Sequence, residues 1–425
     1  MTEKIITAVD LGSSKICVVI AALHDNNKYE LKGYGISESK GIENGLVRDL
    51  QRTAESIIQA VIQAEEQAGI AAENVFVGVS GQHIRTKNTE GRVSVAVGNQ
   101  PGEIDQSNIE AVINDAINTL KRDGSSERME ILHCIPQIYD IDSQKGIINP
   151  IGMSGFSITV HTHIILAETT HIKNIKRAFE MANISKISVV LGAIATAEAI
   201  TNDDEKRLGC IVLDIGEGTS DLMIFQNSYL KSFLSIPKGG SLITHDLAIG
   251  LRTPPMAAEN LKIDFGNALP NTISADAMVE IQGIGGRSNQ KKPHSLISEI
   301  IQIRLNEILD SCYRDLLTEF NRLDSLTAGL ILTGGTSLIK NIQYLIEDEN
   351  GFNLPCRIAY PETRKLSGAI SRFEDPRYST VIGILYYAMD KKGTSTNKSR
   401  KPKDNKITKN ISNFFKKTFS KISEL

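Results

Sequence analysis

The sequence has few of the residues that build disulfide-linked or zinc-bound folds. Its 425 residues include no tryptophan and only five cysteines, which are widely separated and form no C-x-x-C pair. We therefore expect reduced thiols in a packed core rather than a disulfide framework or a zinc site. No run of about eighteen apolar residues occurs, so a bilayer-spanning helix is not expected. The opening residues, MTEKIITAVD, lack the basic and apolar regions of a signal peptide.

Charge is unevenly distributed along the chain. The net charge is −3, but residues 391–425 contain eleven Lys and Arg against two acidic residues, so this segment carries +9 and the rest −12. An acidic body argues against nucleic acid as a partner, whereas a basic tail favours an anionic one. Apolar residues make up 41% and charged residues 23%, which is ordinary globular usage and permits a large core.

Two distant segments share a strand–turn–strand pattern. Residues 5–23 read IITAVD, LGSSK and ICVVIAAL, and residues 209–226 read GCIVLDIGEGTSDLMIFQ; in each, an Asp ends the first strand and a glycine turn follows. A further apolar strand ends in a Gly-Gly turn within AGLILTGGTSLI at 328–339. The repetition predicts a duplicated fold. Between the two halves, short strand-like pieces surround one helix, which predicts a small α+β insertion at 86–166.

The glycine turns carry the groups that a polyphosphate needs. Glycine lets backbone N–H donors approach closely, and the carboxylates of Asp10 and Asp214 can hold Mg²⁺ through water. No G-x-x-x-x-G-K-[ST] P-loop occurs in the sequence. A single turn of this kind is more often a plain hairpin corner. Two turns with matching Asp positions, together with the Gly-Gly turn, favour a nucleotide clamp.

These motifs resemble those of the actin/Hsp70/sugar-kinase superfamily. DLGSSK is similar to its first phosphate motif, DIGEGTSD to its second and LTGGTSLI to its adenosine motif. The segments GIENGLVRD, VFVGVSGQHI, INPIGMSG and PKGGSLITHDLAIGL resemble one branch, the FtsA family of bacterial cell-division proteins. The resemblance covers about 1–390 and includes the final amphipathic segment. It implies an α/β, actin-like duplicated RNase-H-like fold with a small α+β insertion domain and a C-terminal amphipathic helix.

Composition and resemblance together divide the chain into six expected segments. They are the first half of actin-like domain 1 at 1–85, the insertion at 86–166, a return to domain 1 at 167–205, actin-like domain 2 at 206–390 with a smaller subdomain at about 240–320, a flexible basic linker at 391–406, and a membrane-targeting amphipathic helix at 407–425.

The resemblance implies ATP and Mg²⁺ as ligands and assigns residues to them. The first phosphate loop would consist of Asp10, Gly12, Ser13, Ser14 and Lys15, and the second of Asp214, Gly216, Glu217, Gly218 and Thr219. Gly239 and Gly240 would lie near phosphate or sugar, and Glu259 and Lys262 near ribose and base. The adenosine side would be formed by Gly334, Gly335, Thr336 and Ser337. Asp10 and Asp214 would hold Mg²⁺ through water. Actin has a histidine near the attacking water where this sequence has Asp221. No general base is identified, so we expect at most slow ATPase activity.

The last residues have the pattern of an amphipathic helix. At 100° per residue, seven apolar residues of 407–425 fall within an arc of about 140°. Ile411, Phe414, Phe415, Phe419 and Ile422 lie on this arc, and Lys417 and Lys421 lie on its flank. Large aromatic side chains with flanking lysines are typical of a helix that lies in the membrane surface. The alternative is a terminal helix docked on the protein's own body.

The resemblance also implies a cellular role. The protein would be a peripheral protein on the cytoplasmic face of the inner membrane at the division septum, where it polymerises head to tail and tethers the FtsZ ring to anionic lipids. The FtsZ C-terminal tail would bind the subdomain at 240–320, with Arg304 and Asn306 as candidate contacts, and later division proteins would bind the insertion domain. The alternatives are an FtsA-like pilus-assembly adaptor that binds ATP, and a sugar or acetate kinase, for which the sequence has no acceptor-pocket signature.

Overall fold

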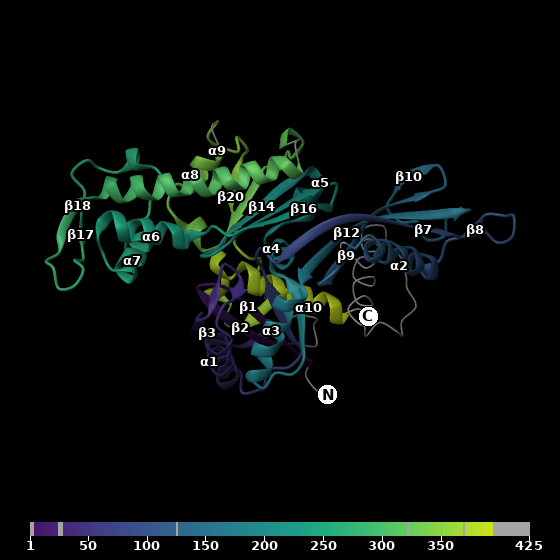
Figure 1. Ribbon diagram of the computed structural model, residues 1–425, viewed down its shortest axis with the longest axis horizontal. Coiled ribbons are helices and arrows are strands. Elements are labelled where there is room, and N and C mark those ends of the chain that lie inside the picture. Colours follow the sequence, from purple (N-terminus) through teal and green to yellow (C-terminus); the bar gives the residue numbers. More distant parts are fainter. Residues whose placement is uncertain are drawn as a thin grey trace.

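Two sheets with corresponding strand orders form the body of the molecule (Figure 1). The computed structural model describes residues 4–23, 29–124, 126–320, 323–349, 351–368 and 370–393. The first sheet has the order β13-β6-β1-β2-β3-β21 and the second the order β16-β15-β14-β19-β20. The strands of the first sheet are β1 (Ile5–Leu11), β2 (Lys15–Leu23), β3 (Tyr29–Glu38), β6 (Val75–Val79), β13 (Ile187–Leu191) and β21 (Leu366–Gly368). The strands of the second sheet are β14 (Cys210–Ile215), β15 (Ser220–Gln226), β16 (Tyr229–Ile236), β19 (Leu330–Thr333) and β20 (Cys356–Ile358).

Each sheet combines an antiparallel meander with parallel strands. β1 pairs antiparallel with β2 and parallel with β6, and β14 pairs antiparallel with β15 and parallel with β19. In β2 every residue from the second to the eighth is buried, as expected for an apolar, β-branched strand covered on both faces. The predicted duplicated α/β fold is therefore confirmed.

Four helices cover the first sheet. α1 (Leu50–Ala68) packs with α3 (Thr169–Met181), and α4 (Gly192–Ile200) packs with α10 (Ser379–Gly393), which also contacts β1 and β6 (Figure 1). The side chain of Asp49 caps α1 by accepting a hydrogen bond from the backbone N–H of Arg52. Gly69 ends the helix in the left-handed region at φ 69°, which a glycine adopts without strain.

The insertion forms a separate layer beside the body (Figure 1). Its four-stranded sheet has the order β10-β9-β12-β7 and is covered by α2 (Gln106–Arg122). The strands are β7 (Ile84–Ser94), β9 (Met129–Ile141), β10 (Gln144–Ile147) and β12 (Ser157–Glu168), with a small ladder of β8 (Gly102–Glu103) and β11 (Ser154–Gly155). A core of its own includes Ile109, Val112, Ile113 and Tyr139. This layer is consistent with an independent α+β unit.

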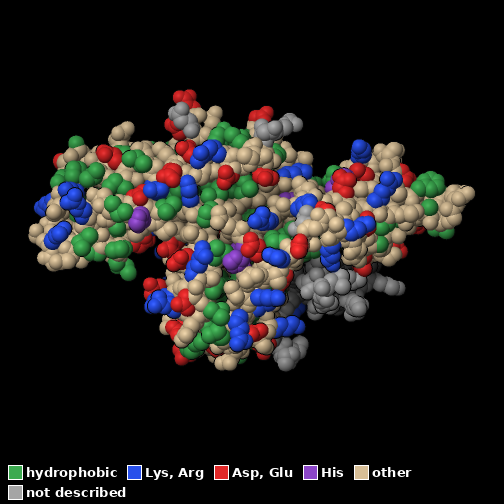
Figure 2. Space-filling model, viewed as in Figure 1, with side chains coloured by type: hydrophobic (Ala, Val, Ile, Leu, Met, Phe, Trp, Pro, Cys, Tyr) green, Lys and Arg blue, Asp and Glu red, His purple; other side chains and the backbone are tan. Residues whose placement is uncertain are grey.

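A helical subdomain extends the second half. It contains α6 (Gly240–Leu251), α7 (Pro255–Phe265), the long α8 (His294–Glu319) and the hairpin of β17 (Met278–Ile281) and β18 (Gln290–Pro293). The remaining α-helices and strands are α5 (Asp203–Leu208), α9 (Ile342–Glu347) and the short pair of β4 (Ile42–Glu43) and β5 (Leu46–Val47). Basic and acidic side chains are intermixed over the face of the body in Figure 2.

Several expectations concern the cysteines and the C-terminal segments. All five cysteines have free thiols, and four of them are buried. Among the described residues, no helix is both long and apolar enough to cross a membrane. α10 continues to Gly393, three residues into the expected linker. The rest of that linker and the whole of 407–425, with its predicted membrane-contacting residues, lie outside the described residues.

Candidate functional site

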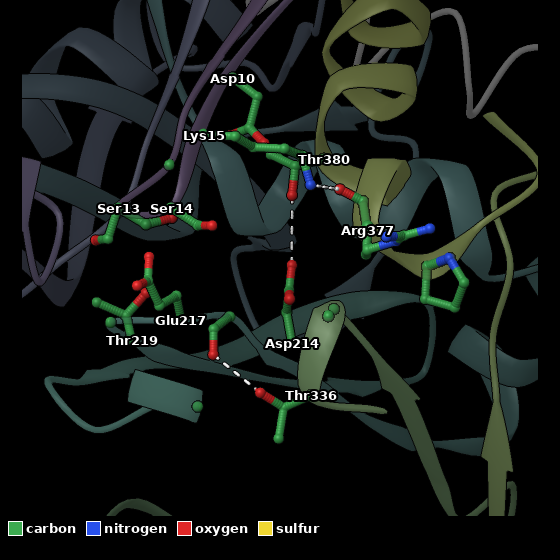
Figure 3. A pocket seen from close by; sticks show the side chains of 18 of the residues that line it. Asp10, Ser13, Ser14, Lys15, Asp214, Glu217, Thr219, Thr336, Arg377 and Thr380 are labelled. Carbon is green, nitrogen blue, oxygen red and sulfur yellow. Dashed lines mark hydrogen bonds between the residues drawn. The ribbon is translucent and has the colours of Figure 1, made fainter. Parts of the chain in front are cut away.

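One cleft of about 490 Å³ collects loops from both halves of the molecule (Figure 3). The turn after β1, the turn after β14, the start of α6, part of α7, the turn after β19 and the start of α10 all line it. A concave site of this size, with convergent polar groups, is suited to a small molecule.

The two hairpin turns have the same backbone geometry. The N–H of Gly12 donates to the carbonyl of Lys15 at 3.1 Å, and the N–H of Gly216 donates to the carbonyl of Thr219 at 2.9 Å. In each turn the glycine lies two residues after the aspartate, and its N–H donates to the carbonyl of the residue three positions further along the chain. The internal repeat read from the sequence therefore extends to the hydrogen bonding of the turns.

Asp10 and Asp214 lie at the ends of the corresponding strands, where both line the cleft. Burial raises the pKa of Asp10 to about 6, although Lys15 opposes the shift. Burial, followed by repulsion from Asp221 and Asp10, raises the pKa of Asp214 to about 7. The hydroxyls of Thr196 and Thr380 donate to Asp214 Oδ2 at 3.3 and 3.4 Å. A cation would relieve the repulsion between these carboxylates.

Asp221 is a further carboxylate in the cleft. It faces Asp214 across the β14–β15 ladder and is 5% exposed. Ser235 Oγ donates to its Oδ1 at 2.5 Å, and burial raises its pKa. Within the described residues, no group of three or more His, Cys, Asp and Glu side chains is arranged to hold a metal ion directly.

The far wall of the cleft is formed by α6 and α7. Lys262 Nζ donates to the carbonyl of Gly240 at 3.1 Å and pairs with Glu259 at 2.7 Å. Burial and the nearby Glu259 raise the pKa of Glu217, which lies in the second turn. These charged side chains come from different elements and meet only in the folded chain.

The third glycine turn is joined closely to the second. Gly334 has φ 87°, and a Cβ there would lie 2.3 Å from Asp214 Oδ1 and 2.5 Å from the carbonyl oxygen of Ile215. Thr336 Oγ1 donates to the carbonyl of Gly216 at 3.1 Å. A 3₁₀ turn over Gly335–Leu338 follows. Only glycine fits at 334, because any side chain there would overlap the second turn.

Sixteen of the eighteen residues assigned to the nucleotide line the cleft. The other two, Gly239 and Ser337, do not. A Cβ at Gly239 would lie 2.4 Å from the carbonyl oxygen of Glu217, so this glycine lets α6 approach the second turn. Ser337 is fully buried, and its Oγ donates to the carbonyl of Gly334 at 2.7 Å. Both residues therefore support the loops that line the cleft without lining it themselves.

The sequence motifs missed a group of residues just before and at the start of α10. Pro376, Arg377, Tyr378 and Thr380 line the cleft, together with Gly78 and Ser80 of the first half and the apolar Ile263, Leu338 and Ile339. Lys15 Nζ donates to the carbonyl of Arg377 at 2.9 Å and lies 4.6 Å from the centre of the Tyr378 ring. The one available signal was the turn-forming stretch EDPRYST before an apolar helix.

The two predicted partner contacts lie on α8, away from the cleft. Arg304 forms a bidentate pair with Asp246 of α6, with Nε–Oδ2 at 2.5 Å and Nη2–Oδ1 at 2.9 Å, and also pairs with Glu307. Asn306 is exposed. Arg304 therefore joins α6 to α8, whereas Asn306 presents a free surface amide.

Two family descriptions match the chain. "Cell division protein FtsA" matches residues 211–383, and "SHS2 domain inserted in FTSA" matches residues 81–166. The chain is 34% identical over 391 residues to the cell division protein FtsA of Neisseria meningitidis serogroup B, with 92% of each chain covered. It is 31% identical over 425 residues to that of Buchnera aphidicola subsp. Schizaphis graminum, with 98% of this chain and 99% of the relative covered.

Solved structures with a similar fold are much more distant in sequence. A chain of a PilM–PilN type IV pilus biogenesis complex has a TM-score of 0.63 and 15% identity, covering 90% of this chain and 98% of that one. MreB5 of Spiroplasma citri bound to ADP has a TM-score of 0.55 and 13% identity, covering 93% and 99%. These similarities confirm the expected actin-like fold. Because its curated relatives align over almost the whole length, the chain belongs to the FtsA family of cell-division proteins.

Proposed function

We propose that the chain binds ATP together with Mg²⁺ in the cleft. The observation that carries this proposal is the pair of equivalent glycine turns, each next to an aspartate, that line the cleft from opposite halves. Turns of this kind present backbone N–H donors to polyphosphate oxygens. The similar fold of MreB5 from Spiroplasma citri, which is bound to ADP in its solved structure, supports a nucleotide as the ligand.

The lining residues divide into two ends of the proposed site. The phosphates would lie between the first turn, with Ser13, Ser14 and Lys15, and the second turn at 216–219. The nucleoside would lie toward Gly335 and Thr336, with Glu259 and Lys262 of α7 near the ribose. This division follows the resemblance, in which the two hairpin turns correspond to the phosphate motifs and the third glycine turn corresponds to the adenosine motif.

The residues of the cleft fit a magnesium ion held through water. Mg²⁺ supplies positive charge that neutralises phosphate oxygens and keeps several of its own waters. Asp10 and Asp214 would accept hydrogen bonds from such waters. Burial is the main cause of the raised pKa of each carboxyl group, so a cation in the cleft would favour their ionised forms. A water-mediated site needs no cluster of directly coordinating side chains.

Filling the third turn tests the nucleotide site. A Cβ at Gly335 would meet only Arg377 Cγ, at 3.6 Å, so a side chain there would project into the cleft without disturbing the fold. Gly335→Leu should therefore abolish ATP binding measured by calorimetry, and the smaller Gly335→Ala should weaken it less. Unchanged ATP affinity in a folded Gly335→Leu variant would refute the site.

We also propose that any hydrolysis is slow. Among the described residues that line the cleft there is no histidine or glutamine to position an attacking water, and Asp221 accepts a hydrogen bond from Ser235. A kinase role in the same superfamily would need a catalytic carboxylate facing an acceptor pocket. Slow turnover suits a protein whose nucleotide controls assembly rather than metabolism.

We propose that this member of the division family polymerises beneath the inner membrane and tethers the FtsZ ring to it. Head-to-tail contacts through the insertion at 86–166 would generate open filaments, because heterologous contacts that do not close form a chain of subunits. The insertion has a core and a sheet of its own, so it can be exchanged as a unit. If its excision left lipid-supported polymers intact, this role would be wrong.

The FtsZ tail is proposed to bind the helical subdomain around α8. Asn306→Ala should weaken binding of an FtsZ tail peptide without changing the unfolding midpoint, because Asn306 is exposed. Arg304→Ala should lower both, because it breaks the pair that joins α6 to α8. Undiminished peptide binding in both variants would move the docking surface elsewhere.

We propose that residues 407–425 contact the membrane.

The pilus-adaptor alternative is supported by a fold similarity at 15% sequence identity, whereas a division relative is 34% identical to this chain. Truncation after Gly393, where α10 ends, separates the two readings. Loss of septal localisation is expected for a membrane-tethering division protein, and unchanged localisation would favour the adaptor.

A further inference from the structure

A short segment that leads into α10 forms part of the cleft wall, in addition to the glycine turns and the helices α6 and α7. We call residues 375–380 the entry segment; its members Pro376, Arg377, Tyr378 and Thr380 all line the cleft. The main chain of this segment faces the first turn, since the carbonyl of Arg377 accepts a hydrogen bond from Lys15 Nζ. The Tyr378 ring lies beneath the same ammonium group. The entry segment therefore contacts the proposed phosphate end through the Arg377 carbonyl, the Tyr378 ring and the Thr380 hydroxyl, which donates to Asp214, but not through the Arg377 side chain.

The Arg377 side chain is held rigidly at the rim. Its Nε donates to Asp375 Oδ1 at 2.9 Å and its Nη2 donates to Oδ2 at 2.8 Å, and the backbone N–H of Arg377 donates to the same carboxylate at 2.9 Å. The side chain is nevertheless 52% exposed. This bidentate pair uses two of the five N–H donors of a guanidinium and fixes its plane. A rigid and half-exposed guanidinium is prepared to receive a ligand.

The side chain of Arg377 lies away from the hydroxyl groups of the proposed phosphate end. In Figure 3, Arg377 lies on the opposite side of Asp214 from Ser13, Ser14 and Thr219. Its Cγ lies 3.6 Å from the place where a Cβ of Gly335 would be, so a group lying against that glycine also meets this side chain. The same loop continues into Leu338, which is 44% exposed, and Ile263 of α7 is 68% exposed in the lining. This end of the cleft combines a flat cation with uncovered apolar side chains.

We propose that Arg377 is the residue that binds the base of the nucleotide, with its guanidinium plane stacked on the aromatic ring. The assignment rests on the proposed nucleotide site and adds to it a contact that none of the glycine motifs contains. Arginine stacks on aromatic faces, and lysine lacks the planar group that this requires. Asp375 is the positioning residue, because it fixes the orientation of the guanidinium and lies outside the cleft lining.

The test compares two ligands that differ in whether they carry a base. The affinities of the full-length protein for Mg-ATP and for magnesium-loaded inorganic tripolyphosphate are measured for wild type, Arg377→Ala, Arg377→Lys and Asp375→Asn. Arg377→Ala should weaken ATP binding about tenfold, as expected for loss of a desolvated cation–π contact, and leave tripolyphosphate unchanged. Arg377→Lys retains the charge and should still lose most of the preference for ATP. Asp375→Asn should lose part of it.

Three results would overturn the assignment. Equal losses for ATP and tripolyphosphate in Arg377→Ala would mean that Arg377 acts on phosphate or on Lys15. Unchanged ATP binding in Arg377→Ala and Arg377→Lys, with unfolding midpoints like wild type, would mean that the side chain touches no ligand. A wild-type protein that bound neither ligand would refute the nucleotide site itself, and this outcome is recognised before any variant is made.

Discussion

The adjacent glycines of the third turn should respond very differently to the same added methyl group. At Gly334 a Cβ would lie 2.3 Å from Asp214 Oδ1, 2.5 Å from the Ile215 carbonyl oxygen and 2.8 Å from the carbonyl carbon. At Gly335 the nearest atom is Arg377 Cγ at 3.6 Å, an ordinary contact distance. Gly334→Ala and Gly335→Ala are therefore a matched pair in one loop.

Two penalties add at Gly334. The backbone at φ 87° and ψ 170° lies in a region essentially restricted to glycine and costs an alanine about 1–3 kcal/mol. Forcing a methyl group into a packed site costs typically a further 1–3 kcal/mol, because two backbone atoms and a carboxylate must move. The expected loss of unfolding free energy is thus about 2–6 kcal/mol. At Gly335 neither penalty applies, and an alanine can stabilise by a few tenths of a kcal/mol through the unfolded chain.

The assay is urea unfolding of the nucleotide-free protein followed by circular dichroism. Gly334→Ala should shift the midpoint to lower urea, or leave the second half unfolded, while Gly335→Ala should match the wild type within about 0.5–1 kcal/mol. ATP binding of Gly335→Ala is measured separately, since that residue faces the cleft. Wild-type stability in Gly334→Ala would refute the account of how the second and third turns are joined.

Three other predictions concern pH, turnover and the tail. Because the pKa values of Asp10 and Asp214 are raised to about 6 and 7, the folded state binds more protons than the unfolded state and loses stability as the pH rises from about 4 to 7. Asp214→Asn should therefore stabilise the nucleotide-free protein more at pH 8 than at pH 5; equal effects at both pH values would contradict the shift. ATP turnover should be far below about 10 per second, and a steady-state rate near that value would restore the kinase reading. Phe415→Glu should release the full-length protein from anionic vesicles in a sedimentation assay, because a buried large apolar side chain contributes up to about 1.5–3 kcal/mol. Lys417→Ala should weaken binding modestly, since a lysine near the surface contributes about 1 kcal/mol, and the reverse ranking would mean a purely electrostatic tether.

The parts of the site that the sequence predicts are those encoded within a few consecutive residues. Asp10 to Lys15 and Asp214 to Thr219 each contain the strand end, the glycine and the turn-closing residue, so the local pattern determines the geometry. The duplication made the prediction stronger, because two matching turns have to lie at equivalent edges of two equivalent sheets.

The rest depends on packing between distant segments. Arg377 enters the cleft only because α10 packs on β1, and the residue that it contacts, Lys15, is 362 positions away in the chain. The resemblance assigned Gly239 and Ser337 to the ligand together with the rest of their motifs, but neighbours in a loop point in different directions. Ser337 Oγ donates back to the carbonyl of Gly334, a contact that the local sequence pattern does not specify.

The course of α10 has a mechanical consequence. The helix begins at the cleft, where the Thr380 hydroxyl donates to Asp214 at 3.4 Å, and it ends at Gly393, from which the chain leads on to the C-terminal segment. Val381, Ile382, Ile384, Leu385 and Ala388 are buried along its length. A tensile force applied to the chain beyond residue 393 would therefore act parallel to the axis of this packed helix, as shear against the elements around it. If the C-terminal segment is anchored as proposed, tension on it would act along α10 and reach the Asp214 carboxylate, which accepts hydrogen bonds from Thr196 and Thr380.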